Sequence, residues 1–359
     1  MNASKLAGRA VAGVLFLAVA LIPMVSSTFF TSAVALTALW MGLAAASLTF
    51  LAGYGGMISL AQTGLFGVAG FLAADLSVDQ GLHPWLAGLI GVAAAVAVGL
   101  VFGAVASGSQ GIYFLMITLA FAMITYSYFA AVPTFGAHEG INGVLPPSIL
   151  GDPVLAPTRM YYFTLAVCVL VYLALSALTR TAFGLALQGV RDDPVRMEAL
   201  GFNVRLHRTL AFAAAAAVAG MAGVLSVWSN TRISAGSISL DIAIYVLTAA
   251  VIGGLYRLEG AWVGGFVFVV LDTYLRGFSD RFATWLGVAF LVIVVASPGG
   301  LAGIAVSLGE RFGRRGRSGS LGGDGAAAGP PGGAGSPAPV PEPGAAARGG
   351  DVSMGGAER

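Results

Sequence analysis

The chain is poor in charged residues, in cysteine and in lysine. Only 9% of its 359 residues are charged, whereas an ordinary soluble domain carries roughly a quarter. This shortage excludes a soluble globular protein, and the net charge of +2 provides no basic footprint for nucleic acid. The single cysteine, Cys168, lies in an apolar run, which excludes a disulfide framework and a thiolate metal cluster.

Long apolar runs without any charge take the place of the missing polar residues. Asp, Glu, Lys and Arg are absent from four stretches, at 10–74, 80–138, 209–231 and 282–309. Uncharged apolar runs longer than about 18 residues are typical of membrane-spanning helices, and several of these stretches have room for two or more. The sequence therefore predicts an all-α, polytopic integral membrane protein in a lipid bilayer.

Proline, glycine and charged residues divide the apolar runs into about ten predicted transmembrane helices. We expect them at 8–29, 31–53, 64–79, 84–106, 110–132, 160–179, 209–228, 241–257, 258–276 and 281–305. The first resembles a signal peptide, but its apolar stretch continues past Pro23 without a clear cleavage site, so we expect an uncleaved helix.

Basic residues predict the orientation, because they concentrate in cytoplasmic loops. They cluster before the first predicted helix, in the segment 180–208 and after the last predicted helix. Even numbers of predicted helices separate these clusters, so all three can lie inside. Both termini and the turn at 257–259 are then cytoplasmic, while the segments 75–83 and 133–159 and the loop containing Arg232 lie outside.

The composition divides the chain into a transmembrane domain at 1–312 and a tail at 313–359. The tail is rich in Gly, Pro and Ala and has almost no large apolar side chain. Such a segment cannot bury enough surface to offset its ordering entropy. We expect a disordered cytoplasmic tail.

The sequence offers little for catalysis. HExxH, GxSxG and Walker-type motifs are absent, and the three histidines lie in predicted loops or at span boundaries. We therefore expect no enzyme, no metal or cofactor site and no ATP binding by this chain. Ion coupling is also disfavoured, because Asp272 and Arg276 are the only pair inside an apolar stretch, near the outer end of a predicted helix. We interpret them as an interfacial ion pair, with a gate or docking contact on the outer face as the alternative.

The segment 180–208 is the most informative part of the sequence. Eight of its 29 residues are charged, whereas the flanking predicted helices have almost none. Asp193 can serve as a helix N-cap, Pro194 fits the first helical position, and Gly201 is placed to end the helix. The pattern predicts a short cytosolic helix whose small apolar side, near Val195, is sized for a groove in a partner protein. A solvated loop without a partner is the alternative.

The same segment resembles a cytoplasmic stretch of the permease subunits of ATP-binding-cassette (ABC) importers. The likeness is to the branched-chain amino acid type, and to the second, M-type kind of its two related permeases. That family carries G-x-A-L-x-A-I-R-E-N-E-x-A-A-E-A-L-G-I-N. The matching residues here are Gly184, Ala186, Leu187, Arg191, Glu198, Ala199, Leu200, Gly201 and Asn203, with Asp192 as a similar substitution. Pro194 departs from the pattern, since the family frequently has an acidic residue there.

Three further motifs follow the family's order and extend the resemblance over about residues 33–300. The first is similar to G-Y-x-G-x-x-S-L-x-x-x-x-F-F-G-x-x-A-Y and matches Gly53, Tyr54, Gly56, Ser59, Leu60, Phe66 and Gly67. The second is GIYFLMITLAFA at 111–122, which includes Tyr113 and Thr118. The third is a glycine-rich turn with Gly253, Gly254 and Gly260.

The resemblance implies an ABC importer permease fold and a matching function. The chain would form half of a translocation path for branched-chain amino acids in the plasma membrane of a prokaryote. Its implied partners are a second homologous permease subunit, two cytosolic ATP-binding-cassette subunits that bind and hydrolyse ATP, and an extracytoplasmic substrate-binding protein.

The resemblance also implies roles for individual residues. ATPase coupling would fall to Arg191, Asp192, Asp193, Glu198, Ala199, Leu200 and Gly201. The translocation path and its helix packing would involve Gly53, Tyr54, Gly56, Ser59, Leu60, Phe66, Gly67, Tyr113 and Thr118.

Other functions stay open at this point. Sister permeases carry urea, short amides or other amino acids, and specificity resides largely in the binding protein. A secondary transporter would take up substrate without ATPase subunits. A structural or assembly protein of the membrane would show no solute flux.

The arginine distribution makes the orientation testable. A reporter enzyme that is active only outside the membrane should work when fused near Gly143 and fail when fused near Asp193, because only the second site lies in a basic loop. The measurement is reporter activity at matched expression. Activity at Asp193 alone would invert the orientation, and equal activity at both sites would change the number of spans between them.

Overall fold

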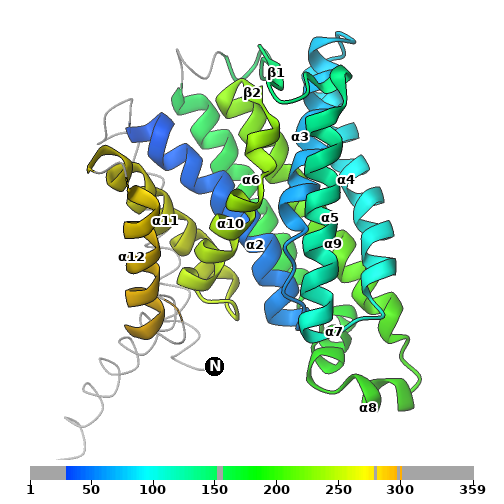
Figure 1. Ribbon diagram of the computed structural model, residues 1–359. Helices are drawn as coiled ribbons and strands as arrows, with labels where there is room; N and C mark the ends of the chain where they lie inside the picture. Colours follow the sequence, from blue (N-terminus) through cyan, green and yellow to red (C-terminus); the bar gives the residue numbers. More distant parts are fainter. Residues whose placement is uncertain (1–29, 152–156, 279–280, 297–299, 301–359) are drawn as a thin grey trace, which may run out of the picture. The chain divides into compact units, whose positions relative to one another are not determined.

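The computed structural model describes residues 30–151, 157–278, 281–296 and 300. The helix predicted at 8–29 and the tail predicted at 313–359 lie outside the described residues. The described chain is almost entirely helical (Figure 1). Its α-helices are α2 (Leu36–Gly55), α3 (Gln62–Val78), α4 (Pro84–Ala106), α5 (Gly111–Ala131), α6 (Pro157–Leu178), α7 (Ala182–Asp192), α8 (Pro194–Ala199), α9 (Val204–Asn230), α10 (Leu240–Gly253), α11 (Leu258–Phe278) and α12 (Phe282–Ala296).

Short elements complete the described chain. A π-helical turn, Phe30–Ala35, leads directly into α2, and 3₁₀ turns cover Pro133–Phe135 and Ala235–Ile238. Two strands of two residues, β1 (Ile141–Asn142) and β2 (Arg232–Ile233), pair antiparallel.

Each helix predicted after the first has a counterpart among the described residues, but the count of about ten spans is not confirmed. Within the described residues, six helical stretches are long and apolar enough to cross a membrane: Phe30–Gly55, Pro84–Ala106, Gly111–Ala131, Pro157–Leu178, Val204–Asn230 and Leu258–Gly277. The apolar helices α3 and α10 are shorter, with 17 and 14 residues. Helix α9 begins at Val204 rather than at the predicted 209, because the Asn203 side chain accepts a hydrogen bond from the Leu206 N–H (3.0 Å) and caps it.

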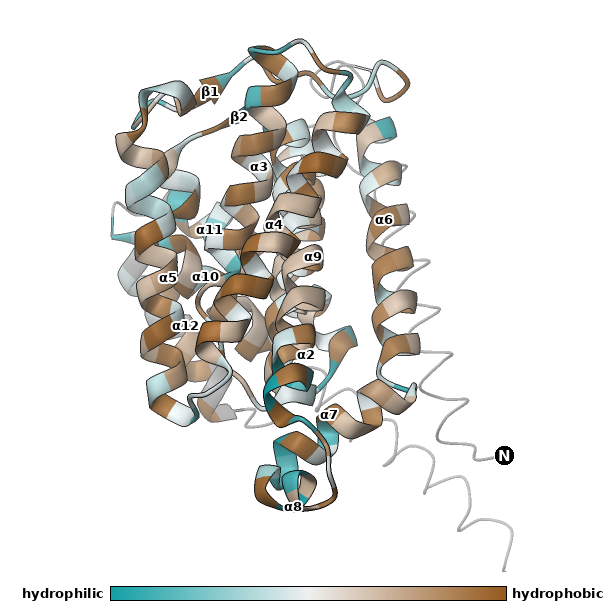
Figure 2. Cartoon of the chain, turned by 90° about the vertical axis from the view of Figure 1, so that its right-hand side faces the viewer, coloured by the Kyte–Doolittle hydropathy of each residue, from teal (hydrophilic) through white to brown (hydrophobic). Residues whose placement is uncertain are grey.

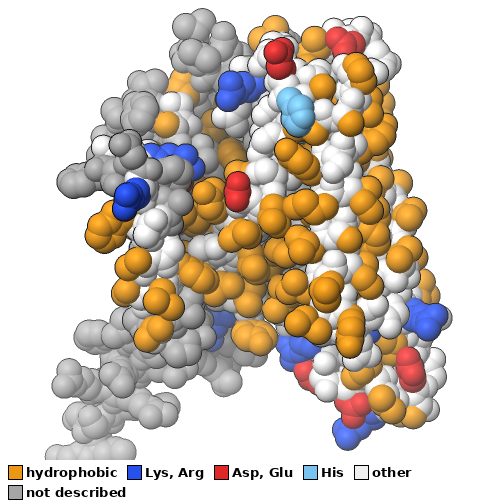
Figure 3. Space-filling view, in the orientation of Figure 1, with side chains coloured by type: hydrophobic (Ala, Val, Ile, Leu, Met, Phe, Trp, Pro, Cys, Tyr) orange, Lys and Arg blue, Asp and Glu red, His pale blue; other side chains and the backbone are white. Residues whose placement is uncertain are grey.

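Two helices form the centre of the described bundle. In the apolar part of α2 and its preceding turn, 89% of the residues are buried, and in that of α9 78% are buried. In α4 the corresponding share is 28%. Helix α9 packs against α4, α3 and α2, and α2 also packs against α11 and α10. Hydrophobic residues run along α4, α5 and α6 (Figure 2), and hydrophobic side chains cover the face that α5 presents in Figure 3. Such an apolar surface suits contact with lipid.

Glycines let the central helices approach closely. Where α11 crosses α2, a Cβ on Gly265 would lie 2.7 Å from the Cα of Gly42. Where α4 meets α9, a Cβ on Gly103 would lie 2.9 Å from the Cβ of Phe212. Close backbone packing of this kind is the main source of helix association in a bilayer, where burial of apolar area gives no advantage over lipid contact.

The two ends of the bundle carry different segments. At one end β1 pairs with β2, and the Val144 N–H donates to the Thr231 carbonyl (3.0 Å), so the two long loops expected outside lie side by side. At the other end α7 and α8 carry hydrophilic residues of the segment 180–208 (Figure 2). The pairing of β1 with β2 agrees with the expectation that these two loops lie on the same side of the membrane.

The glycine contact between α2 and α11 predicts a specific loss of stability. Gly265→Ala should destabilise the protein by about 1–3 kcal/mol, because the new Cβ would clash with the backbone of Gly42. Gly287→Ala in α12 is the matched control, since a Cβ there meets nothing within 4 Å and gains the same helix propensity. Thermal unfolding in detergent measures both. Equal melting temperatures for the two variants would contradict the close contact.

Candidate functional site

The site is built around a break between α2 and α3. Helix α2 ends where Gly56 takes a left-handed conformation (φ +67°), which glycine adopts at little cost. The Gly56 N–H donates to the Ala52 carbonyl and the Met57 N–H to the Leu51 carbonyl, both at 3.1 Å. The following segment, 56–61, is not helical, although most of its side chains are buried. The chain therefore carries irregular backbone inside an apolar bundle.

Side chains satisfy the backbone of this break. The Leu60 N–H donates to Thr118 Oγ1 on α5 (3.2 Å), and the Ala61 N–H donates to Ser59 Oγ (3.2 Å). Ser59 and Thr118 are fully buried. Non-helical backbone at membrane depth is tolerated only where protein or a water-filled cavity satisfies it. Three of the predicted site residues, Ser59, Leu60 and Thr118, thus lie together and hold the break in place.

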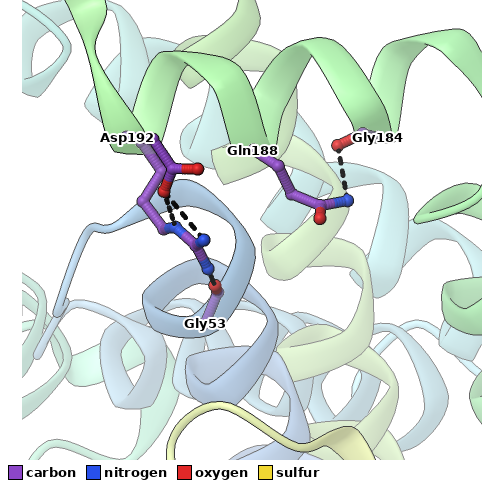
Figure 4. Close-up of polar contacts among 5 residues, drawn as sticks. Gly53, Gly184, Gln188 and Asp192 are labelled. Carbon is purple, nitrogen blue, oxygen red and sulfur yellow. Dashed lines mark hydrogen bonds and ion pairs between the residues drawn. The ribbon is translucent and has the colours of Figure 1, made fainter. Parts of the chain in front are cut away.

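Arg191, in the segment 180–208, contacts the same end of α2. Figure 4 shows where Gly53 and Asp192, its two partners, lie. Its Nη1 donates to the Gly53 carbonyl, and its Nε and Nη2 bind Asp192 Oδ1, each at 2.8 Å. A Cβ on Gly56 would lie 2.6 Å from the Arg191 Cγ, so the arginine stem rests on this glycine. A cation at a helix C-terminus is favourable because the last carbonyls lack partners within the helix. The structure brings Gly53, Gly56 and Arg191 together, although they belong to two separate motifs.

The short helix predicted at 193–201 is present as α8. Asp193 Oδ1 accepts a hydrogen bond from the Arg196 N–H (3.0 Å), Pro194 takes the first position, and Gly201 follows the helix with φ +90°. None of the α8 residues is buried. Val195 is 75% exposed, and the side chains that follow it on this surface are also exposed, at Glu198, Ala199, Leu200 and Phe202.

Helix α7 was missed by the sequence analysis, which placed one short helix in this segment. Its Leu187 and Val190 are fully buried, and the Thr181 hydroxyl caps its N-terminus by accepting from the Gly184 N–H (3.4 Å). Gln188 donates to the carbonyls of Thr179 (3.3 Å) and Gly184 (3.1 Å). The spacing of Leu187 and Val190 was the signal that could have found it.

The remaining predicted site residues lie elsewhere. Tyr54 is partly buried and stacks on Phe50, with ring centroids 6.0 Å apart. Phe66 is buried near Trp40, and a Cβ on Gly67 would meet the Ile238 side chain. Tyr113 is 72% exposed on α5, away from the buried break.

Sequence reasoning also missed uncharged polar groups in the core. Gln62, the first residue of α3, is 2% exposed, and neither atom of its side-chain amide has a hydrogen-bond partner in the described part of the chain. The same holds for the hydroxyls of Thr49 and Thr164 and for the indole N–H of Trp40. Buried polar groups are rarely left without a partner, so these positions are candidates for contact with water or a solute.

The charged groups expected inside apolar stretches form an ion pair along α11. Arg276 Nε lies 2.9 Å from both carboxylate oxygens of Asp272, one turn earlier in α11. Within the residues that the structure describes, no three His, Cys, Asp or Glu side chains are placed to hold a metal ion.

Comparison with known proteins identifies the family. Residues 30–297 match the model of the branched-chain amino acid transport system/permease component family. The chain belongs to this family. The permease is therefore a multi-pass membrane component of an ABC transport system and not an enzyme.

Individual relatives of the permease are distant. It is 26% identical over 136 residues to the probable branched-chain amino acid transport permease protein LivH of Methanocaldococcus jannaschii, covering 35% of this chain and 42% of LivH. It is 27% identical over 173 residues to the high-affinity branched-chain amino acid transport system permease protein BraD of Pseudomonas aeruginosa, covering 46% and 56%.

A sugar permease is similar at the same level. The permease is 26% identical over 231 residues to the fructose import permease protein FruF of Bifidobacterium longum, covering 60% of this chain and 61% of FruF. The matches thus span less than two thirds of each of these relatives. No solved structure matches the chain significantly.

The hydrogen bond that holds the break predicts a difference between two threonines of α5. Thr118→Val should lower the free energy of unfolding by about 1–3 kcal/mol more than Thr125→Val, because it leaves the buried Leu60 N–H without an acceptor. Both hydroxyls donate to a carbonyl of their own helix, at Leu115 and Phe121, but only Thr118 accepts from another segment. Thermal unfolding of the two variants checks this. Equal destabilisation would show that the bond across the break contributes nothing.

Proposed function

We propose that the permease forms half of the translocation path for branched-chain amino acids in an ATP-driven importer. Its partners in this proposal are a second homologous permease subunit, two cytosolic ATPase subunits and an extracytoplasmic substrate-binding protein. The assembly lies in the cytoplasmic membrane of a prokaryote with both termini of this chain inside, and this subunit is of the M-type. The family description and the names of LivH and BraD support the substrate class.

The observation that carries the coupling part of the proposal is α8. It is a capped helix with no buried residue. Apolar side chains are exposed within it at Val195 (75%) and directly after it at Leu200 (67%) and Phe202 (42%). Charged residues surround them, at Asp192, Asp193, Arg196 and Glu198. A small apolar surface with a polar rim is the pattern of a helix that docks in a groove of a partner protein. The ATPase subunit is the partner that the family provides.

Arg191 gives this docking helix a mechanical connection to the membrane domain. It lies on α7, two residues before the α8 N-cap, and it binds the Gly53 carbonyl at the end of α2. Movement of α8 with an ATPase subunit would pull on α7 and so on the end of α2, beside the break at 56–61. A switch between outward and inward access would follow from displacement of this bistable segment.

The proposed path runs beside the break and offers little charge. Arg191 beside the break is paired with Asp192. Apart from Arg208, the buried side-chain groups without partners in the described part of the chain are neutral, among them those of Gln62, Thr49 and Thr164. A neutral, weakly polar lining would release an apolar amino acid without holding it, which suits delivery by a separate binding protein. A sugar has more hydroxyls to satisfy than such a lining offers, although the similarity to FruF keeps sugar transport as the second candidate.

Reconstitution tests the substrate class. The permease is placed in vesicles with its partner permease, ATPase subunits and binding protein, and ATP-dependent uptake of labelled leucine, isoleucine and valine is compared with that of fructose, urea and short amides. Uptake of leucine that depends on ATP supports the proposal. Uptake of fructose or of an amide alone would replace the substrate class, and uptake without ATPase subunits would exclude the coupling mechanism.

Ala199→Asp tests the docking role of α8. The new carboxylate adds a charge to the exposed apolar surface, so we expect normal abundance in the membrane but loss of most ATPase co-purification and of ATP-coupled uptake. Ala182→Asp is the matched control, because Ala182 is also exposed, lies in the same segment and begins α7, where a carboxylate is favourable. Wild-type coupling in Ala199→Asp would remove the docking role and leave 180–208 a solvated segment.

A further inference from the structure

A second feature at the α7–α8 end of the bundle is a cleft with two arginines. The cleft has a volume of about 120 Å³ and lies between the break after α2, the turn from α4 to α5, and the starts of α8 and α9. Its polar lining includes Arg191, Arg208, Ser109 and Gln110. Neither the coupling surface of α8 nor the proposed path uses Arg208.

Arg208 is buried without a matching charge. It is 7% exposed, and its Nη1 donates a hydrogen bond to the Ser107 carbonyl (3.3 Å). Its Nε has no hydrogen-bond partner in the described part of the chain, and no carboxylate there lies within 4.0 Å of it. Glu198 acts on this charge electrostatically but forms no ion pair with it. A buried guanidinium without a carboxylate in contact is costly, because its charge is removed from water with little compensation. An anion in the cleft would supply the missing partner.

The N-terminus of α5 also favours an anion in this cleft. This helix has 21 residues, and its N-cap, Gln110, makes no side-chain capping bond. The first N–H groups of a helix lack partners within the helix and carry partial positive charge. Because Gln110, Gly111 and Phe114 line the cleft, this helix end and Arg208 face one space.

The second arginine of the cleft is already neutralised. Arg191 is paired with Asp192 at 2.8 Å, so the uncompensated positive charge comes from Arg208 and the α5 N-terminus. Asp193 is likewise engaged, since it caps α8 and pairs with Arg196 at 3.4 Å.

We propose that this cleft binds a phosphate-type oxyanion through Arg208 and the first N–H groups of α5. A tetrahedral oxyanion accepts hydrogen bonds from several directions, which matches a guanidinium and a helix end that meet at one point. The phosphate belongs either to the headgroup of an anionic lipid or to free inorganic phosphate. The lipid source is favoured by exposed apolar side chains directly beside the α5 N-terminus, at Ile112 (70%), Tyr113 (72%) and Met116 (61%), along which acyl chains can lie.

Two arms of one experiment separate the sources. The full-length permease with its partner subunits is placed in nanodiscs of phosphatidylcholine with a rising share of phosphatidylglycerol. In the second arm, nanodiscs of phosphatidylcholine alone receive inorganic phosphate against chloride at equal ionic strength. A ligand that binds only the folded state raises the melting temperature, so thermal unfolding reports binding in both arms.

Three variants assign the effect to the cleft. Arg208→Gln should raise the apparent dissociation constant about tenfold or more, because a charge-assisted contact is lost. Gln110→Glu should raise the apparent dissociation constant in the same way, because it places a carboxylate of similar size at the exposed mouth of the cleft. If Arg208→Gln does not fold, the Gln110→Glu variant tests the proposal by itself. Arg205→Gln is the matched control, because Arg205 lies one turn earlier on α9 and is exposed.

The outcomes are distinct. Stabilisation by phosphatidylglycerol that is lost in the two cleft variants and kept in Arg205→Gln supports the site with a lipid headgroup, and the same pattern with inorganic phosphate supports it with the free anion. No stabilisation of the wild type in either arm would overturn the proposal. An equal loss in Arg205→Gln would also overturn it, since the effect would then be one of net charge alone. Neither arm measures transport, so the result is independent of the substrate.

Discussion

The structure depends on one constraint: inside a bilayer every backbone N–H and C=O must find a partner within the protein. Helices meet this requirement by themselves, but the break at 56–61 does not. It persists because Thr118 and Ser59 accept its N–H groups and Arg191 takes the Gly53 carbonyl. The neighbouring helices α5 and α7 therefore have to lie where they do, and the break positions both of them.

Close packing of α2 fixes the position of the break. Helix α11 reaches the backbone of α2 at Gly42, and the turn before α11 reaches it at Gly53, where a Cβ would lie 2.6 Å from the Leu255 carbonyl oxygen. On the other side, α9 packs against both α2 and α3. A helix held at backbone distance on two sides cannot rotate or slide without separating its neighbours. The mobile parts of the mechanism are thus expected at the end of α2 and not along its length.

The sequence predicted those elements whose signals are local. Asp193, Pro194 and Gly201 mark α8 because capping chemistry acts within one or two turns, and long apolar runs mark the spanning helices. The start of α9 after Asn203 was missed, although Asn203 is also a capping residue, because the charged residues that follow it were interpreted as part of a loop. The burial of Arg208 could not be predicted, since it arises from the packing of α9 against the turn between α4 and α5, which are about a hundred residues away in the sequence. Contacts across such separations leave no pattern within a window of sequence.

In the proposed importer, Arg191 would connect a movement of α8 to the interior of the bundle. Helix α8 has no buried residue, whereas Leu187 and Val190 of α7 are buried in the bundle. A displacement of α8 would therefore act on the bundle through α7. The two helices join at Asp193, whose extended backbone (φ −152°, ψ 91°) is not part of either helix. Because Arg191 precedes this joint and binds the Gly53 carbonyl, a movement of the joint would displace α7 and the end of α2 together in the proposed mechanism. The hydrogen bonds across the break would be affected next. In the proposed importer, energy from ATP would therefore reach the break before it reaches the lipid-facing helices α4 and α6.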